Sequence, residues 1–70
     1  MALAMVSTGD TKKIIEIRAK EEVKKHLLSL GFVIGESVKV VAENASGLIL
    51  MVKGTKIALN RGMASRIIVE

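Results

Sequence analysis

One stretch of helical periodicity stands in a chain whose other apolar segments are short and strand-like. Apolar side chains recur at positions i, i+4 and i+7 within residues 20–30, as Val23, Leu27 and Leu30. Gly31 follows the last of them, where a glycine commonly ends a helix, and Phe32 can supply the hydrophobic contact of that helix stop. We therefore expect one short, well-capped helix in an otherwise β-rich chain.

The remaining apolar segments alternate or run over only a few residues, as strands do. The segments expected to form strands are 3–6, 12–18, 37–42, 48–53, 56–60 and 67–69. In the second of these, Ile15 and Ile17 are expected on the face opposite Glu16. Five or six short strands with one helix and no long loop predict a small closed or nearly closed β-barrel, which would also pair the strand edges.

Glycines mark the predicted connections between these segments. Residues 7–10 and 33–36 are expected to form turns in which Gly9 and Gly35 adopt positive φ. Lys53-Gly54-Thr55 is typical of a tight hairpin between two of the strands. Residues 43–47 are expected to form a loop, and residues 61–66 one irregular or helical turn.

Length and composition exclude several classes of protein. The 70 residues are expected to form one domain, 1–70, of a size that needs a densely packed core. The chain has no cysteine and therefore no disulfide or thiolate metal site. Its apolar runs, such as 48–52, are far shorter than the roughly 18 residues of a membrane-spanning helix, and residues 1–6 lack the basic region of a signal peptide. We expect a soluble, cytoplasmic protein without membrane insertion.

The side chains that usually carry catalysis or metal binding are few and scattered. His26, the one histidine, stands four residues after Glu22, and two ligands are too few for a structural metal site. Ser7, Thr8 and Asp10 share a predicted turn with no base nearby to activate a hydroxyl. No segment resembles a glycine-rich phosphate loop. We therefore expect no enzyme activity, no cofactor, no metal site and no binding of GTP by the chain itself.

The net charge of +4 raises the question of nucleic-acid binding. The 11 Lys and Arg residues are scattered, however, so they form no basic tail. Binding to single strands also depends on aromatic stacking worth about 1–3 kcal/mol per base. Phe32 is the one aromatic residue and is expected in the core, so nucleic acid is not an expected partner.

Apolar side chains exceed what so small a barrel can easily bury. Leu28 lies about 100° or more around the helix from the core stripe, beside lysines, and Ile49 and Met51 occupy one face of their strand. Apolar groups beside lysines are typical of protein contact sites, unless loops or the helix cover them. The candidate partner-binding residues are Lys24, Lys25, Leu28, Ile49 and Met51. Weak dimerisation through the apolar strand is left open.

Three segments resemble the ferrous iron transport protein A (FeoA) family. Residues 25–41, KHLLSLGFVIGESVKVV, are similar to its RLxxLGLxPGxxVxVV segment, residues 52–59 to VxGxxxAL and residues 64–69 to AxxIxV. The likeness is collinear and covers nearly the whole chain. Ile34 replaces the usual proline, and Asn60 stands where the family has a basic residue.

The resemblance implies a cytosolic SH3-like barrel, mainly β, of five to six short strands with one α-helix at about residues 20–30. It also implies an accessory protein of ferrous iron uptake that binds the cytosolic GTP-binding region of the membrane transporter FeoB and modulates it. The same barrel occurs as the C-terminal domain of iron-dependent repressors of the diphtheria toxin repressor type. The alternative is therefore a stand-alone regulatory SH3-like module that acts on a transcription factor.

Overall fold

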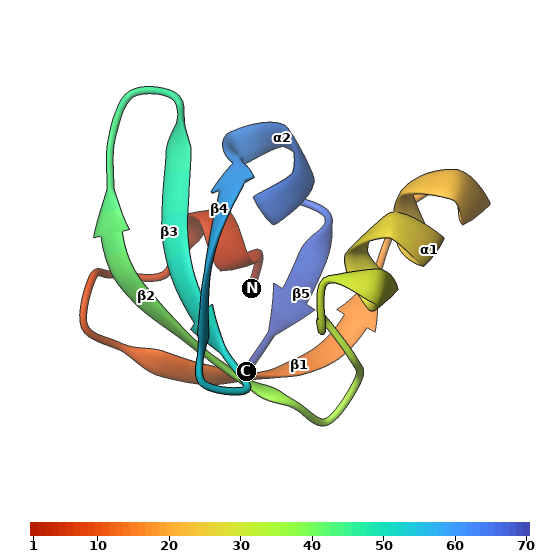
Figure 1. Cartoon of the computed structure of the whole chain (residues 1–70), viewed down its shortest axis with the longest axis horizontal. Helices are drawn as coiled ribbons and strands as arrows, with labels where there is room; N and C mark the ends of the chain where they lie inside the picture. The colour runs from red at the N-terminus through yellow and green to blue at the C-terminus, as the bar shows by residue number, and fades with distance from the viewer.

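The computed structural model describes all residues, 1–70, as a strongly curved antiparallel sheet with short helical segments (Figure 1). The elements in chain order are η1 (Leu3–Met5), β1 (Thr11–Ile17), α1 (Glu21–Ser29), β2 (Ser37–Glu43), β3 (Gly47–Val52), β4 (Thr55–Asn60), α2 (Arg61–Ala64) and β5 (Ile67–Val69). The strand order is β4-β3-β2-β1-β5. The predicted mainly β, barrel-like fold with one principal helix is confirmed, although no ladder joins β4 to β5.

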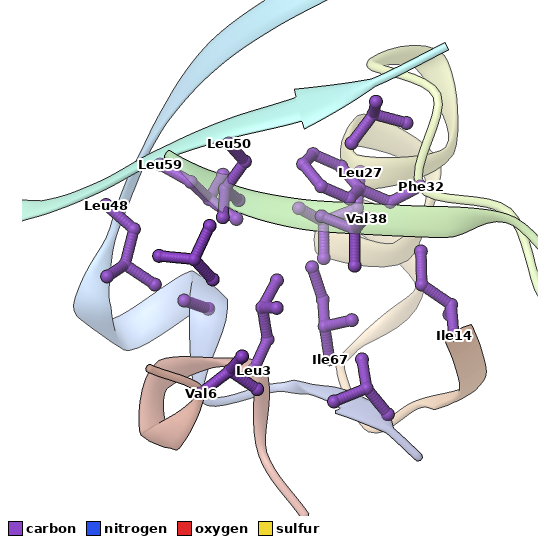
Figure 2. Packing of buried hydrophobic residues seen from close by; sticks show 14 of the residues in the cluster. Leu3, Val6, Ile14, Leu27, Phe32, Val38, Leu48, Leu50, Leu59 and Ile67 are labelled. Atoms are coloured by element: carbon purple, nitrogen blue, oxygen red, sulfur yellow. The ribbon is translucent and has the colours of Figure 1, made fainter. Parts of the chain in front are cut away.

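The inner face of the sheet holds one cluster of 15 buried apolar residues. Leu48, Leu50 and Val52 of β3 are at most 2% exposed, which confirms the predicted inner face of that strand. Figure 2 shows Phe32 entering the core from the helix side and Leu3 from the N-terminal turn. Side chains from outside the strands therefore complete the core.

Residues 3–6 do not form the edge strand that the sequence predicted. Leu3 and Val6 are 0% and 3% exposed, so both face the core although they are three positions apart. A strand would turn them to opposite faces, whereas a 3-10 turn places residues i and i+3 on the same side. The segment before this turn pairs with β5 through a bridge between Ala2 and Ile68, so it covers that edge of the sheet.

The predicted faces of β1 are wrong at Ile15. The pairing with β5 shifts register between Ile14 and Glu16, as at a β-bulge. Ile14 and Ile17, three positions apart, therefore both face the core, while Ile15 is 40% exposed. The bulge changes the phase of the residues that follow it, and in this way it brings Ile17 into the core at the end of β1.

The end of α1 has the geometry that the sequence predicted. The backbone amide of Gly31 donates to the carbonyl of Leu28 at 3.0 Å, and that of Phe32 to the carbonyl of Leu27 at 3.0 Å. These two bonds define a Schellman motif, and Gly31 has the positive φ that it requires, +105°. The helix stop thus directs the fully buried Phe32 into the core beside Leu27.

The turn after the helix and the hairpin are also confirmed. In residues 33–36, Gly35 has φ +94° and the amide of Glu36 donates to the carbonyl of Val33 at 3.0 Å, as in a type II turn. Lys53 and Gly54, with φ of 51° and 75°, form the two-residue turn between β3 and β4.

Asn60 departs from the family pattern for a structural reason. Its side-chain Oδ1 accepts a hydrogen bond from the backbone amide of Met63 at 2.8 Å, so it caps the N-terminus of α2. Asparagine is among the residues that helix N-caps prefer.

Replacing Ile34 with proline is expected to raise the free energy of unfolding by about 0.4–1 kcal/mol. Proline favours this corner of a type II turn, and the amide of Ile34 donates no hydrogen bond that would be lost. Urea denaturation should show a higher midpoint with an unchanged slope.

Ile34→Ala is the control for the proline variant. The Ile34 side chain is 64% exposed, so its truncation should change stability by less than about 0.5 kcal/mol. A proline variant less stable than the alanine variant would show that the turn is not type II.

Candidate functional site

An apolar groove lies between α1 and the turn that follows it. Its volume is about 180 Å³, and its lining residues are Ile17, Glu21, Lys24, Lys25, Leu28, Phe32 and Ile34. Figure 1 shows α1 at one end of the sheet, beside the end of β1. The groove is therefore built by three neighbouring pieces of chain: the last residue of β1, one side of α1, and the segment after the helix that contains Phe32 and Ile34.

The floor of the groove is part of the core, and its walls are exposed. Ile17 is 8% and Phe32 0% exposed, because the bulge and the helix stop direct these side chains inward. Leu28 of α1 is 54% exposed and Ile34 of the turn 64%. Large apolar side chains that remain exposed around a hollow are typical of a surface that contacts another protein.

The rim of the groove is mainly basic. Lys24 and Lys25 are exposed on α1, and Glu21, one helical turn earlier, is the acidic residue of the lining. The two salt bridges of the structure join arginines to glutamates, at 3.1 and 3.2 Å, and neither includes a lysine. Both groove lysines are therefore available to carboxylates of a partner.

The five predicted partner-binding residues lie on two different surfaces. Lys24, Lys25 and Leu28 line the groove. Ile49 and Met51 are half-buried on the outer face of β3, and Ile49 lines a second hollow beside the β2–β3 loop. Contact of these five residues with a partner stays a prediction, but the structure does not bring them together in one site.

Three groove residues were not predicted as site residues. Ile17 reaches the groove through the bulge and Phe32 through the helix stop, and neither looks different from an ordinary core residue in the sequence. Ile34 carried a usable signal, since a large apolar residue at the corner of a glycine turn has little of the fold to cover it. Its replacement of the family's proline marks the same position.

The structure offers no cluster of metal ligands. No group of three or more His, Cys, Asp or Glu side chains lies close enough to hold an ion. His26 and Glu22, the one pair with suitable spacing, are both exposed on α1. That the chain holds no metal stays a prediction. Neither α1 nor α2 has the length and hydropathy of a membrane-crossing helix.

The small antiparallel sheet and its single principal helix define an SH3-like domain. The family model of the FeoA domain matches residues 1–70, and the chain belongs to this family. An Fe(2+) transport protein A of Methanocaldococcus jannaschii is 34% identical over 68 residues, which cover 97% of this chain and 83% of that protein. The chain is thus a member of a ferrous iron transport family, and the resemblance found in its sequence is confirmed.

Solved structures of similar proteins have the same fold. FeoA of Stenotrophomonas maltophilia, described as an SH3 domain protein and solved with zinc, superimposes with a TM-score of 0.88 at 28% identity. The match covers 100% of this chain and 89% of that one. A manganese-dependent transcriptional repressor superimposes with a TM-score of 0.94 at 22% identity, over 100% of this chain and 35% of the repressor. The second likeness is one of fold alone.

Proposed function

We propose that this protein is a cytosolic accessory protein of ferrous iron uptake. It binds the cytosolic GTP-binding region of a FeoB-type transporter and acts through this binding rather than through catalysis. Membership of the FeoA family supports a role in ferrous iron uptake. The groove at α1 supports action through binding, because it combines exposed apolar walls with two lysines that have no ion pair. Modulation of the transporter then requires a difference in affinity for two of its states.

The groove is the principal contact in this proposal. Burial of apolar surface contributes about 25 cal/mol per Å² removed from water, so the side chains with most exposed area have most to contribute. Leu28 and Ile34 are more than half exposed, whereas Ile49 and Met51 are already half-buried in their own fold. The outer face of β3 is therefore the secondary candidate surface.

Replacing Leu28 with alanine is expected to weaken binding of the transporter's cytosolic GTP-binding region by about tenfold or more. Alanine is the best helix former and Leu28 lies outside the core, so the stability of the free protein should not fall. Calorimetric titration with GTP, with GDP and without nucleotide measures the affinity in each state of the partner.

Met51→Ala is the matched control on the outer face of β3, with an expected loss of less than about threefold. A larger loss from Met51→Ala than from Leu28→Ala would place the main contact on β3. No binding by the unmodified protein in any nucleotide state would refute the proposed function.

The alternative function is a regulatory module that acts on a transcription factor. The fold of the manganese-dependent repressor supports it, although the chain spans only about a third of that repressor's length. Such a module should bind a transcription factor and show no affinity for the transporter region. The same titrations therefore distinguish the two functions.

A further inference from the structure

We infer that the groove at α1 takes an acidic amphipathic helix of the partner. In this complex a large apolar side chain of the helix packs against Leu28 and Ile34, and its carboxylates reach Lys24 and Lys25. The inference rests on the proposed function, since it describes the segment of the partner that occupies the same groove.

The lining of the groove favours a helix over an extended segment. An extended peptide joins a sheet through the unpaired backbone groups of an edge strand. Only one of the seven lining residues, Ile17, belongs to a strand, and β1 is paired with β5 at that position. The other lining residues belong to α1 and to the segment that follows it, and the edge strand β4 contributes none of them. A segment in the groove must therefore bind through side chains and satisfy its own backbone hydrogen bonds, as a helix does.

The charges of the groove select an acidic segment. Lys24 and Lys25 stand four and three positions before Leu28, so the three side chains are neighbours on one side of α1, about 5–6 Å apart at Cβ. A helix with an apolar residue on Leu28 brings residues one turn away to the lysines, where carboxylates are favoured. Glu21 lies a further turn away, so the groove is apolar at Ile34, basic in its middle and acidic at its far end.

The outer face of the sheet supplies a comparison with the same charges and no groove. Met51 is paired with Lys39 on one side and with Lys56 on the other. Two lysines therefore flank an apolar residue there too, but Met51 lines neither of the two hollows. If long-range electrostatic attraction alone determined the affinity for the partner, the two lysine pairs would contribute equally to it.

Two double charge reversals test this inference, Lys24→Glu/Lys25→Glu in the groove and Lys39→Glu/Lys56→Glu on the outer face. Each lowers the formal net charge from +4 to neutral. At about 50 mM salt, we expect the groove variant to bind the transporter's cytosolic region about tenfold or more weakly and the outer-face variant less than about threefold. The difference should shrink at about 300 mM salt. Equal losses in the two variants, or no loss in the groove variant, would overturn the inference.

A neutral variant controls for destabilisation of α1 by the charge reversal. Lys24→Gln/Lys25→Gln avoids placing four glutamates on one short helix, where like charges one turn apart are destabilising. It should show an intermediate loss of affinity with unchanged thermal unfolding. Full affinity of this variant would also count against carboxylates at the lysines.

Hydrogen exchange of the complex locates the bound segment. In a two-residue hairpin the residues next to the turn form a hydrogen-bonded pair, so Lys56 and Ala58 direct their amides away from β3, to the free edge. A docked helix should slow exchange in α1 and residues 33–36 and leave these two amides unchanged. Slowed exchange at Lys56 and Ala58 would indicate strand addition and overturn the inference.

The failure of the inference and that of the proposed function give different results. Weaker binding of Leu28→Ala together with full binding of both groove lysine variants would retain the proposed function and refute the acidic helix. No binding by the unmodified protein would refute both.

Discussion

Replacing Gly47 with alanine should lower the free energy of unfolding by about 3 kcal/mol, because the new methyl group has no space. A Cβ at Gly47 would overlap the carbonyl oxygen of Leu59 and lie 2.9 Å from Cα of Asn60. Both atoms are backbone of β4, which is paired with β3 at this point, so neither can rotate away. A domain of 70 residues is stable by only about 3.5–10 kcal/mol. The loss should therefore lower the thermal midpoint by about 12 °C or more.

Gly62→Ala is the matched control for Gly47→Ala. Neither glycine has a positive φ, so the chemical change is the same in both. The nearest atom to a Cβ at Gly62 is the side-chain Oδ1 of Asn60 at 3.3 Å, and the gain in helix propensity of up to about 1 kcal/mol opposes this contact. Urea denaturation should show a change of less than about 1 kcal/mol. Equal losses at the two sites would contradict the role of the β4 backbone.

Local signals in the sequence predicted the parts of the fold that a few adjacent residues determine. The end of α1 needs only the helical stripe and Gly31, and the two confirmed turns need glycines at positions of positive φ. Contacts between distant segments determine the rest. The 3-10 turn at Leu3 forms because the core requires two side chains on one side, and the bulge in β1 depends on its register with β5.

Some residues of the candidate site could likewise be predicted from the sequence, and others could not. Leu28 and its neighbouring lysines could be predicted, since helical phase alone shows that they point away from the core stripe. The positions of Ile17 and Phe32 in the groove could not be predicted, because a core residue lines a groove only where no other element covers it. That α1 leaves this part of the core open follows from the position of the helix at one end of the sheet (Figure 1). The periodicity of apolar residues along the chain does not indicate where the helix lies relative to the sheet.

Replacing Phe32 with alanine should lower the free energy of unfolding by about 3–5 kcal/mol, a large fraction of what a domain of this size has. Phe32 is fully buried and is the one aromatic residue of the core. Its truncation leaves a cavity in the core cluster that also contains Leu27, the residue with which the side chain after such a helix stop commonly packs. Urea denaturation and the dispersion of methyl signals in proton NMR should show a variant that is largely unfolded or close to it.

Phe32→Leu separates the core role of this residue from its place in the groove. Leucine keeps an apolar side chain at the floor, so we expect less than half the loss caused by alanine and a folded protein. Because the floor of the groove is the core itself, a change there should alter stability and binding together. A change in the exposed wall, as in Leu28→Ala, should alter binding alone. A Phe32→Leu variant with full stability but no affinity for the transporter region would contradict this coupling and would mean that the ring contacts the partner directly.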